Sequence, residues 1–267
     1  MHPCLSFLSV FKSFSASPGL NEFPNKITTI QQFKHAIFIN KSIFAVMQLA
    51  KEVKYLIHKE VLLEWRSKYT INGVLLYVVS TIFTCYLSFV SLGDKLTWNA
   101  LFWIIMLFAS INGVSKSFLQ ETKGQQLYSY ILASPAAVLI SKTVYNTLLM
   151  LVLTTIALGF YTLVFDSFTP PDMLLYYVAV VLGSMSFSTV FTMVSAIASK
   201  AGNGGMLMAI LSFPIIIPVL ILLIKLAKNA VDGLPWENSY DEIAMLLVVN
   251  VLMVATSLLL FPYLWRD

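Results

Sequence analysis

The side chains that most often carry catalysis or bind metals are few in this 267-residue sequence, and they are not grouped. The three histidines, His2, His35 and His58, all precede the first long apolar segment. The cysteines, Cys4 and Cys85, form no C-x-x-C pair, so neither a metal site nor a structural disulfide is predicted. No histidine lies within the apolar part of the chain, where it could act as an axial haem ligand. These residues indicate neither an enzyme nor a protein that holds haem directly.

A different kind of chemistry is indicated by two prolines four residues apart, Pro214 and Pro218, inside an apolar segment. Each proline lacks an amide hydrogen and clashes with the carbonyl one helical turn earlier, so both disturb the same face of a helix. In lipid the freed carbonyls need partners from protein or water. Two interpretations stay open, a static kink and a hinge or gate that lines a cavity. The predicted hinge also includes Gly204 and Gly205.

The elements that must position these residues are six long segments without a charged side chain. Each has about 20 residues or more, which is what a helix needs to cross a hydrocarbon core about 30 Å thick. The six segments are Tyr69–Gly93, Leu96–Ser115, Thr143–Phe165, Met173–Ser199, Ala201–Ile224 and Ile243–Trp265. Because a backbone in lipid must satisfy its own hydrogen bonds, such segments form helices. The sequence therefore predicts an all-α membrane protein with six transmembrane helices.

The composition excludes most other classes of protein. The chain is 58% hydrophobic and 11% charged, with a mean hydropathy of +0.81, whereas soluble domains are about 25% charged. Six helices and their connections use the available length, so no ATPase, kinase or protease domain is predicted. No G-x-x-x-x-G-K-[ST] phosphate-binding loop occurs. The net charge of +4 follows membrane topology, and no nucleic-acid partner is predicted.

Basic residues gather in alternate connections, as they do on the cytoplasmic side of a membrane. The ten on one side are Lys51, Lys54, Lys59, Arg66, Lys68, Lys116, Lys123, Lys142, Lys200 and Arg266. The three on the other side are Lys95, Lys225 and Lys228. This distribution predicts that the N-terminus and the C-terminus are both cytoplasmic. Trp98, Trp236 and Trp265 fall near predicted span ends and are interpreted as anchors at the membrane–water interface.

The chain is predicted to have three parts. Residues 1–46 show no sustained periodicity and contain three prolines, so we expect a poorly ordered extension, which an upstream choice of start codon would also explain. Residues 47–70 form an amphipathic elbow helix, and residues 71–267 form the six-helix transmembrane domain. Because the first part lacks a basic segment before its apolar run, a signal peptide is not expected.

The elbow helix is predicted from apolar residues that recur at three- and four-residue spacing. They are Leu49, Val53, Leu56, Ile57, Val61 and Trp65. Lysines between them suit the cytoplasmic headgroup layer of a membrane, and Glu60 and Glu64 stand four apart, where they can pair with nearby Lys or Arg. Two roles stay open for this helix. It is a topological anchor, or it transmits movement to the first span, with Glu60, Glu64, Trp65 and Arg66 as the residues concerned.

The connection at residues 116–135 contains an uncharged interval that is too short and too polar to span, and Pro135 interrupts it. We predict a short helix along the membrane surface and a turn at Ser134-Pro135 back into the bilayer. An apolar ridge beyond Gly124 suits docking in a groove of a soluble partner, although any interfacial loop helix has a similar pattern. The residues assigned to this coupling role are Glu121, Gly124, Leu127, Tyr128, Ile131 and Pro135.

The predicted fourth span is rich in small and hydroxyl-bearing residues, which let neighbouring backbones approach closely. They are Ala179, Gly183, Ser184, Ser188, Thr192, Ser195 and Ser199. This span is therefore expected at the centre of the bundle. Asn112, Asn146 and Asn250 lie in or near spans, and interhelical hydrogen bonds explain them more simply than contact with a substrate. No Asp or Glu lies within the predicted spans, so a carboxylate proton relay is not predicted.

From about Glu60 to Leu264 the sequence resembles the CcmB family, the haem exporter protein B of cytochrome c maturation. The resemblance rests on the Glu64-Trp65-Arg66 elbow, the coupling segment with Glu121 and Gly124, and the span from Lys200 to Ile221 with its paired prolines. The coupling segment alone is shared with many type 2 ABC export permeases. Residues 1–46 have no counterpart in the family.

The resemblance implies an ABC type 2 permease with cytoplasmic elbow and coupling helices, in a bacterial inner membrane. It implies a separate ABC ATPase of the CcmA type, membrane partners of the CcmC and CcmD types, and indirect contact with a haem chaperone of the CcmE type. ATP would bind the ATPase, haem would be cargo of the complex, and this chain would bind no cofactor and catalyse no reaction. ATP hydrolysis would release haem-loaded chaperone for delivery to apocytochromes c outside the membrane.

Three alternatives were weighed against this expectation. A type 2 ABC exporter of a drug, lipid or polysaccharide usually has a larger external domain than these short loops allow. A non-transporting membrane scaffold would be independent of ATP and insensitive to changes at Gly124, Pro214 or Pro218. An integral membrane enzyme is disfavoured because His, Asp and Glu are not clustered.

Overall fold

The computed structural model describes residues 26–67, 69–88, 94–114, 118, 133–165, 170–200 and 204–266. The chain divides into two units, Met1–Gln48 and Leu49–Asp267, which are taken separately below. In the first unit, the described residues belong to helix α2, Lys26–Ser67, which continues into the second. Helix α2 thus begins at Lys26, within residues 1–46, for which a poorly ordered extension stays a prediction. No proline or glycine follows Pro24 until Gly73, so neither of these helix-breaking residues interrupts the helix.

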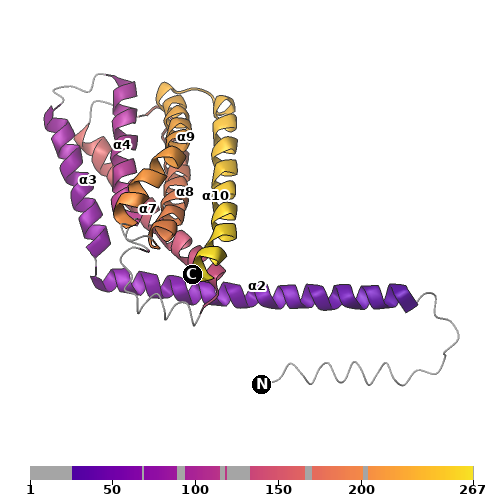
Figure 1. The fold of residues 1–267 in the computed structure, drawn as a ribbon. Coiled ribbons are helices and arrows are strands. Elements are labelled where there is room, and N and C mark those ends of the chain that lie inside the picture. The colour runs from indigo at the N-terminus through magenta and orange to yellow at the C-terminus, as the bar shows by residue number, and fades with distance from the viewer. Residues whose placement is uncertain are drawn as a thin grey trace. The chain divides into compact units, whose positions relative to one another are not determined.

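The second unit contains six helices that are long and apolar enough to cross a membrane, within the described residues. They are α3 Tyr69–Ser88, α4 Lys95–Val114, α7 Pro135–Val164, α8 Met173–Ala198, α9 Gly204–Asp232 and α10 Tyr240–Arg266. The short 3-10 helix η1, Trp236–Ser239, joins the last two. No strand occurs among the described residues. The predicted all-α fold with six spans is confirmed, and the spans lie side by side with the second half of α2 running across one end of them (Figure 1).

Two of the helices extend farthest beyond the predicted spans. Helix α7 begins at Pro135 rather than Thr143, and α9 continues past Ile224 to Asp232. Ser134 has an extended backbone, with φ −68° and ψ 143°, and Pro135 occupies the first turn, where its missing amide hydrogen costs nothing. The helix thus begins at the Ser134-Pro135 junction, where the sequence predicts a turn. At about 1.5 Å per residue, the 30 residues of α7 exceed the thickness of a hydrocarbon core.

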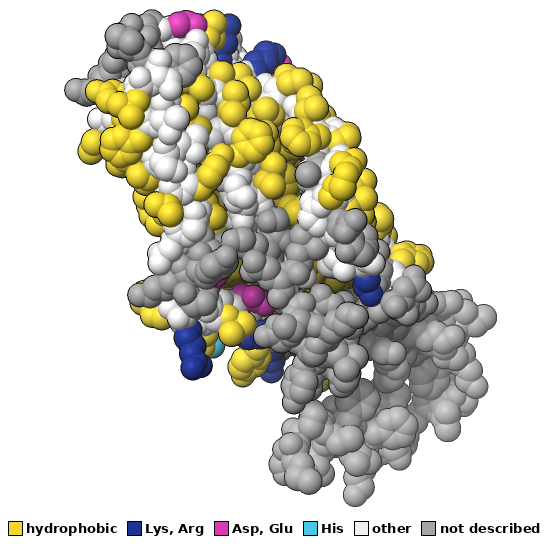
Figure 2. Space-filling view, turned by 60° about the vertical axis from the view of Figure 1, so that its left-hand side comes forward, with side chains coloured by type: hydrophobic (Ala, Val, Ile, Leu, Met, Phe, Trp, Pro, Cys, Tyr) yellow, Lys and Arg dark blue, Asp and Glu magenta, His cyan; other side chains and the backbone are white. Residues whose placement is uncertain are grey.

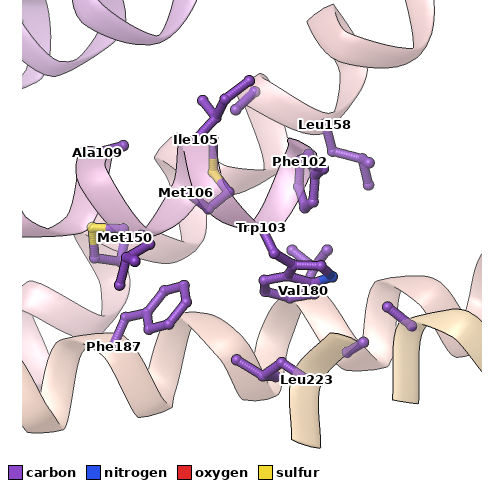
Figure 3. Close-up of a cluster of buried hydrophobic side chains, with 14 of the residues drawn as sticks. Phe102, Trp103, Ile105, Met106, Ala109, Met150, Leu158, Val180, Phe187 and Leu223 are labelled. Carbon is purple, nitrogen blue, oxygen red and sulfur yellow. The ribbon is translucent and has the colours of Figure 1, made fainter. Parts of the chain in front are cut away.

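Helix α8 lies at the centre of the bundle, as its small residues predict. It is the most buried of the six spans and contacts α4, α7, α9 and α10. At Gly183 the closest approach is made by the indole of Trp103 in α4, which is almost completely buried. Figure 3 shows Trp103 in the middle of a cluster to which α4, α7, α8 and α9 all contribute. A residue without a side chain is required at this position because the ring occupies the space.

Replacement of Gly183 by Ala is expected to destabilise the bundle by about 1–3 kcal/mol, the usual cost of overpacking a core. A Cβ atom at this position would lie 2.6 and 2.8 Å from two carbons of the Trp103 ring, and the rigid indole cannot fold away as a flexible side chain would. The matched control is Gly159→Ala in α7, where a Cβ atom would meet nothing within 4 Å. Thermal denaturation in detergent should show a lower Tm for Gly183→Ala only. Equal Tm values for the two variants would contradict this account of the packing.

Hydrogen bonds between side chains join α8 to its neighbours. Asn146 donates to Thr192 Oγ1 at 2.8 Å, and Asn250 donates to Ser186 Oγ at 2.8 Å. These bonds confirm the interhelical role predicted for Asn146 and Asn250. Asn112 differs, because its amide donates to the carbonyl of Phe108 in its own helix.

Trp98 is not an interface anchor, contrary to the prediction. Its side chain is fully buried, and its ring lies 4.9 Å from that of Tyr161 and 5.6 Å from that of Tyr176, centroid to centroid. The Tyr161 hydroxyl donates to the Trp98 carbonyl at 2.8 Å. These distances are typical of favourable contacts between aromatic rings. Tyr161 belongs to α7 and Tyr176 to α8, so the sequence around Trp98 gives no sign of them.

Candidate functional site

The second half of α2 presents one face to the bundle. The half-buried residues of this face recur at helical spacing and are Leu49, Glu52, Val53, Leu56, Ile57, Glu60 and Glu64. Leu56 packs against a small core formed where α7 begins and where α8 and α10 end, which contains Phe118, Val138, Leu139, Ala196 and Phe261. We call this region the α2 end of the bundle, and the opposite region the far end. The predicted amphipathic helix is therefore present, and its apolar side rests partly on protein.

All three carboxylates of this face bind the bundle, beginning with Glu52. Its Oε2 accepts a hydrogen bond from the Ser134 hydroxyl at 2.8 Å and one from the Ser134 backbone N–H at 3.3 Å. Ser134 immediately precedes Pro135, the first residue of α7. Bonds to a charged acceptor are stronger than neutral ones. Glu52 therefore holds the point at which the chain enters α7.

Glu60 forms an ion pair with a buried lysine. Lys142 Nζ lies 3.4 Å from Glu60 Oε1, and the lysine side chain is only 3% exposed. The same ammonium group lies 4.9 Å from the centre of the Phe118 ring, a distance at which a cation is attracted to an aromatic face. Lys59 Nζ lies 3.6 Å from the same carboxylate oxygen but is largely exposed. The predicted pairing of Glu60 is confirmed, and its main partner comes from α7, more than 80 residues away in sequence.

Glu64 contacts the start of the first span. Its Oε1 accepts a hydrogen bond from the Ile71 backbone N–H at 3.1 Å, in the first turn of α3. The first backbone N–H groups of a helix have no partner within the helix, so a carboxylate at this place serves as a cap. Trp65 and Arg66, the other predicted elbow residues, are exposed, and Trp65 also borders a cavity of about 190 Å³ between α2, α3 and α7.

These contacts lie near both ends of the predicted coupling connection, residues 116–135. Near its start, the Phe118 ring packs on Phe261 at 5.7 Å between centroids and faces Lys142. Near its end, Ser134 is bound by Glu52. Five of the six predicted coupling residues lie outside the described residues, namely Glu121, Gly124, Leu127, Tyr128 and Ile131. The sixth, Pro135, begins α7. Thus both flanks of the segment at residues 119–132 are connected to α2.

The predicted hinge lies in α9, which continues as a helix through both prolines. The side chains of Pro214 and Pro218 are exposed. Gly204 begins the helix, and a Cβ atom at Gly205 would meet nothing within 4 Å. The prolines do not line the cavity of about 300 Å³ between α7, α8 and α10. The prolines therefore lie on an outward face of α9.

Beyond Pro218, α9 is bound on several sides. Asn99 of α4 donates to the Ile224 carbonyl at 3.1 Å, and Lys225 Nζ lies 2.7 Å from Glu242 Oε1 of α10. Asn229 donates to Ser239 Oγ at 3.1 Å. Before Pro214, Met208 and Ser212 are the buried residues of the helix among those described. The two prolines thus separate a firmly bound segment at the far end from a more exposed one.

Sequence reasoning missed Glu52, Ser134, Phe118 and Lys142. A signal existed for Lys142, which is the only charged residue between Lys123 and Asp166. A lone charge amid so many apolar residues needs a buried partner, whereas the sequence analysis counted Lys142 only as a topology marker. Among the described residues, no group of three or more His, Cys, Asp or Glu side chains could hold a metal ion.

Comparison with known proteins gives the family of the chain. The family model described as CcmB protein matches residues 51–263, from Lys51 in α2 to Tyr263 in α10. No curated protein matches the chain.

Proposed function

The chain belongs to the CcmB family, and from that premise we propose that it converts ATP hydrolysis by a separate ABC ATPase into movement of its spans. The family consists of ABC transporter permease subunits for haem transport and cytochrome c biogenesis, which act in a complex with other Ccm proteins. The protein is accordingly a multi-pass membrane protein of a family of non-catalytic subunits.

One observation carries the proposal, namely that both flanks of residues 119–132 are connected to α2. A soluble ATPase that docks on this segment through Glu121, Gly124, Leu127, Tyr128 and Ile131 would move Ser134 and Phe118. Movement of Ser134 would act on Glu52 and on the start of α7, and movement beside Phe118 would act on the Lys142–Glu60 pair. Since Glu64 binds the start of α3, α2 would pass the displacement to the first span. This favours the transmitting role of the elbow over a mere anchor.

The second step of the proposal is bending of α9 about Gly204, Gly205, Pro214 and Pro218. The segment beyond Pro218 is bound to α4, η1 and α10, so it would stay in place while the part before Pro214 moves. Prolines weaken a helix locally because they remove backbone hydrogen bonds. Exposed side chains at both prolines would let them shift without disturbing the core.

The remaining parts of the proposal follow the family. The ATPase is of the CcmA type and binds the ATP, the membrane partners are of the CcmC and CcmD types, and haem is cargo of the complex. Release of a haem-loaded CcmE-type chaperone is the outcome of each cycle. The α2 end of the bundle faces the cytoplasm of a bacterial inner membrane, and the ten basic residues predicted on the cytoplasmic side imply that both termini are cytoplasmic too.

The test is purification of the tagged chain in a gentle detergent, with mass spectrometry of the proteins that accompany it. We expect one ABC ATPase and a haem-handling membrane protein. Gly124→Pro should break the coupling helix and remove the ATPase while the haem-handling protein stays. Recovery of an ATPase alone would favour an exporter of a drug, lipid or polysaccharide. Absence of any ATPase would favour a scaffold, and a Gly124→Pro variant that retains the ATPase would refute the assigned docking segment.

A further inference from the structure

We propose that the outward face of α2 binds anionic phospholipid headgroups and so links the position of this helix to the charge of the membrane surface. We call this surface the basic face, and it comprises Lys51, Lys54, Tyr55, His58, Lys59, Leu62 and Arg66. The inference concerns the surface itself and does not depend on what the complex transports.

The first observation is that charges of opposite sign lie on opposite sides of α2. Between Leu49 and Ser67, each acidic residue is half-buried and contacts α3 or α7, as shown above for Glu52, Glu60 and Glu64. Each basic residue in the same stretch is exposed. A salt-bridged surface helix mixes the two signs along one face. Here the separation leaves a wholly basic outward face.

The second observation is that most of these basic groups have no ion pair with the described residues of the chain. Lys59 lies near Glu60, but within the part of the chain that the structure describes no carboxylate forms an ion pair with Lys51, Lys54 or Arg66. Figure 2 shows Lys and Arg side chains and a histidine gathered near the α2 end, with acidic side chains farther toward the spans. A face with unneutralised positive charge attracts an anionic surface.

The third observation identifies the surface as a membrane rather than a soluble acidic protein. Tyr55 and Trp65 are 76% and 75% exposed, and Leu62 is 54% exposed. Helices that lie in the headgroup layer combine such aromatic and apolar side chains with Lys and Arg. Because Glu64 binds the Ile71 backbone N–H, α2 lies at the start of the first span, where the anionic headgroups of the surrounding lipid would be the nearest negatively charged surface.

The test uses the full chain purified in detergent and native mass spectrometry with added lipid. Phosphatidylglycerol and phosphatidylcholine with identical acyl chains are the two probes. Each Lys or Arg near an anionic surface contributes about five-fold to binding. The variant Lys51→Gln/Lys54→Gln/Arg66→Gln should therefore lose the preference for phosphatidylglycerol by more than about ten-fold. Because these side chains are exposed, its Tm in phosphatidylcholine should equal that of the wild type.

Two controls make the result specific. Lys51→Arg/Lys54→Arg/Arg66→Lys keeps every charge and should keep the preference, and Lys228→Gln at the far end should leave it unchanged. A wild-type chain that binds both lipids equally would overturn the proposal, as would undiminished preference in the triple Gln variant. If that variant keeps the lipid preference but loses a co-purifying protein, the basic face docks a protein and the lipid proposal is wrong.

Discussion

Replacement of Glu60 by Gln should both destabilise the protein and abolish cytochrome c maturation. The change removes the negative charge that lies 3.4 Å from the Lys142 ammonium group, whose side chain is only 3% exposed. Loss of one member of a buried ion pair costs on the order of 3 kcal/mol. The ring of Phe118, 4.9 Å away, offsets part of that cost. The measurements are Tm in detergent and the yield of a c-type cytochrome in cells that depend on this gene.

The control for this change is Lys59→Gln on the same helix. Lys59 also lies near Glu60, at 3.6 Å, but its side chain is 42% exposed. Exposed ion pairs contribute about 0–1 kcal/mol, so this variant should retain wild-type Tm and maturation. If Glu60→Gln has the same Tm and maturation as Lys59→Gln, the buried pair does not stabilise the protein. The proposed transmission of movement through α2 would then be wrong.

A double variant separates stability from transmission. Glu60→Leu/Lys142→Met removes both charges and keeps side chains of similar volume, a replacement that is often neutral or stabilising for buried ion pairs. We expect Tm to recover, whereas maturation should stay low because the charged link between Glu60 of α2 and Lys142 of α7 is lost. Recovery of both properties would mean that the pair only stabilises the fold.

The spans were predictable because lipid leaves the backbone few alternatives. Segments of about 20 uncharged residues can only be helices there, and all six are. Their ends were less predictable, since the prediction ended each span at a charge. Lys142 and Lys225 instead lie inside α7 and α9, where each has a carboxylate partner from another helix.

The candidate site was predictable in its elements and not in its contacts. The spacing of apolar residues predicted the elbow helix, and the four-residue spacing of Glu60 and Glu64 predicted that they form ion pairs. Both predictions depend only on residues close together in the sequence. The partners Ser134, Lys142 and Ile71 lie on other helices, and helical spacing in α2 says nothing about them. Glu52 was missed for the same reason. Trp98 illustrates the opposite error, because a position near a span end suggested an anchor whereas Tyr161 and Tyr176 bury the ring.

Replacement of both Pro214 and Pro218 by Ala should leave the fold intact and impair maturation about ten-fold, a barrier raised by about 1.4 kcal/mol. Alanine restores the backbone N–H at both positions, so the carbonyls of Ile210 and of residue 214 regain helical hydrogen bonds. Both proline side chains are exposed, so no packing is lost, and Tm should be equal or higher. Stiffening of α9 between its bound far segment and its more exposed beginning would then be the cause of the defect.

The matched control is Pro262→Ala, which changes an exposed proline inside α10. This variant should mature cytochrome c normally. Normal maturation in the double variant would mean that the prolines form a static kink, and the movement of the spans would have to be sought elsewhere in the bundle.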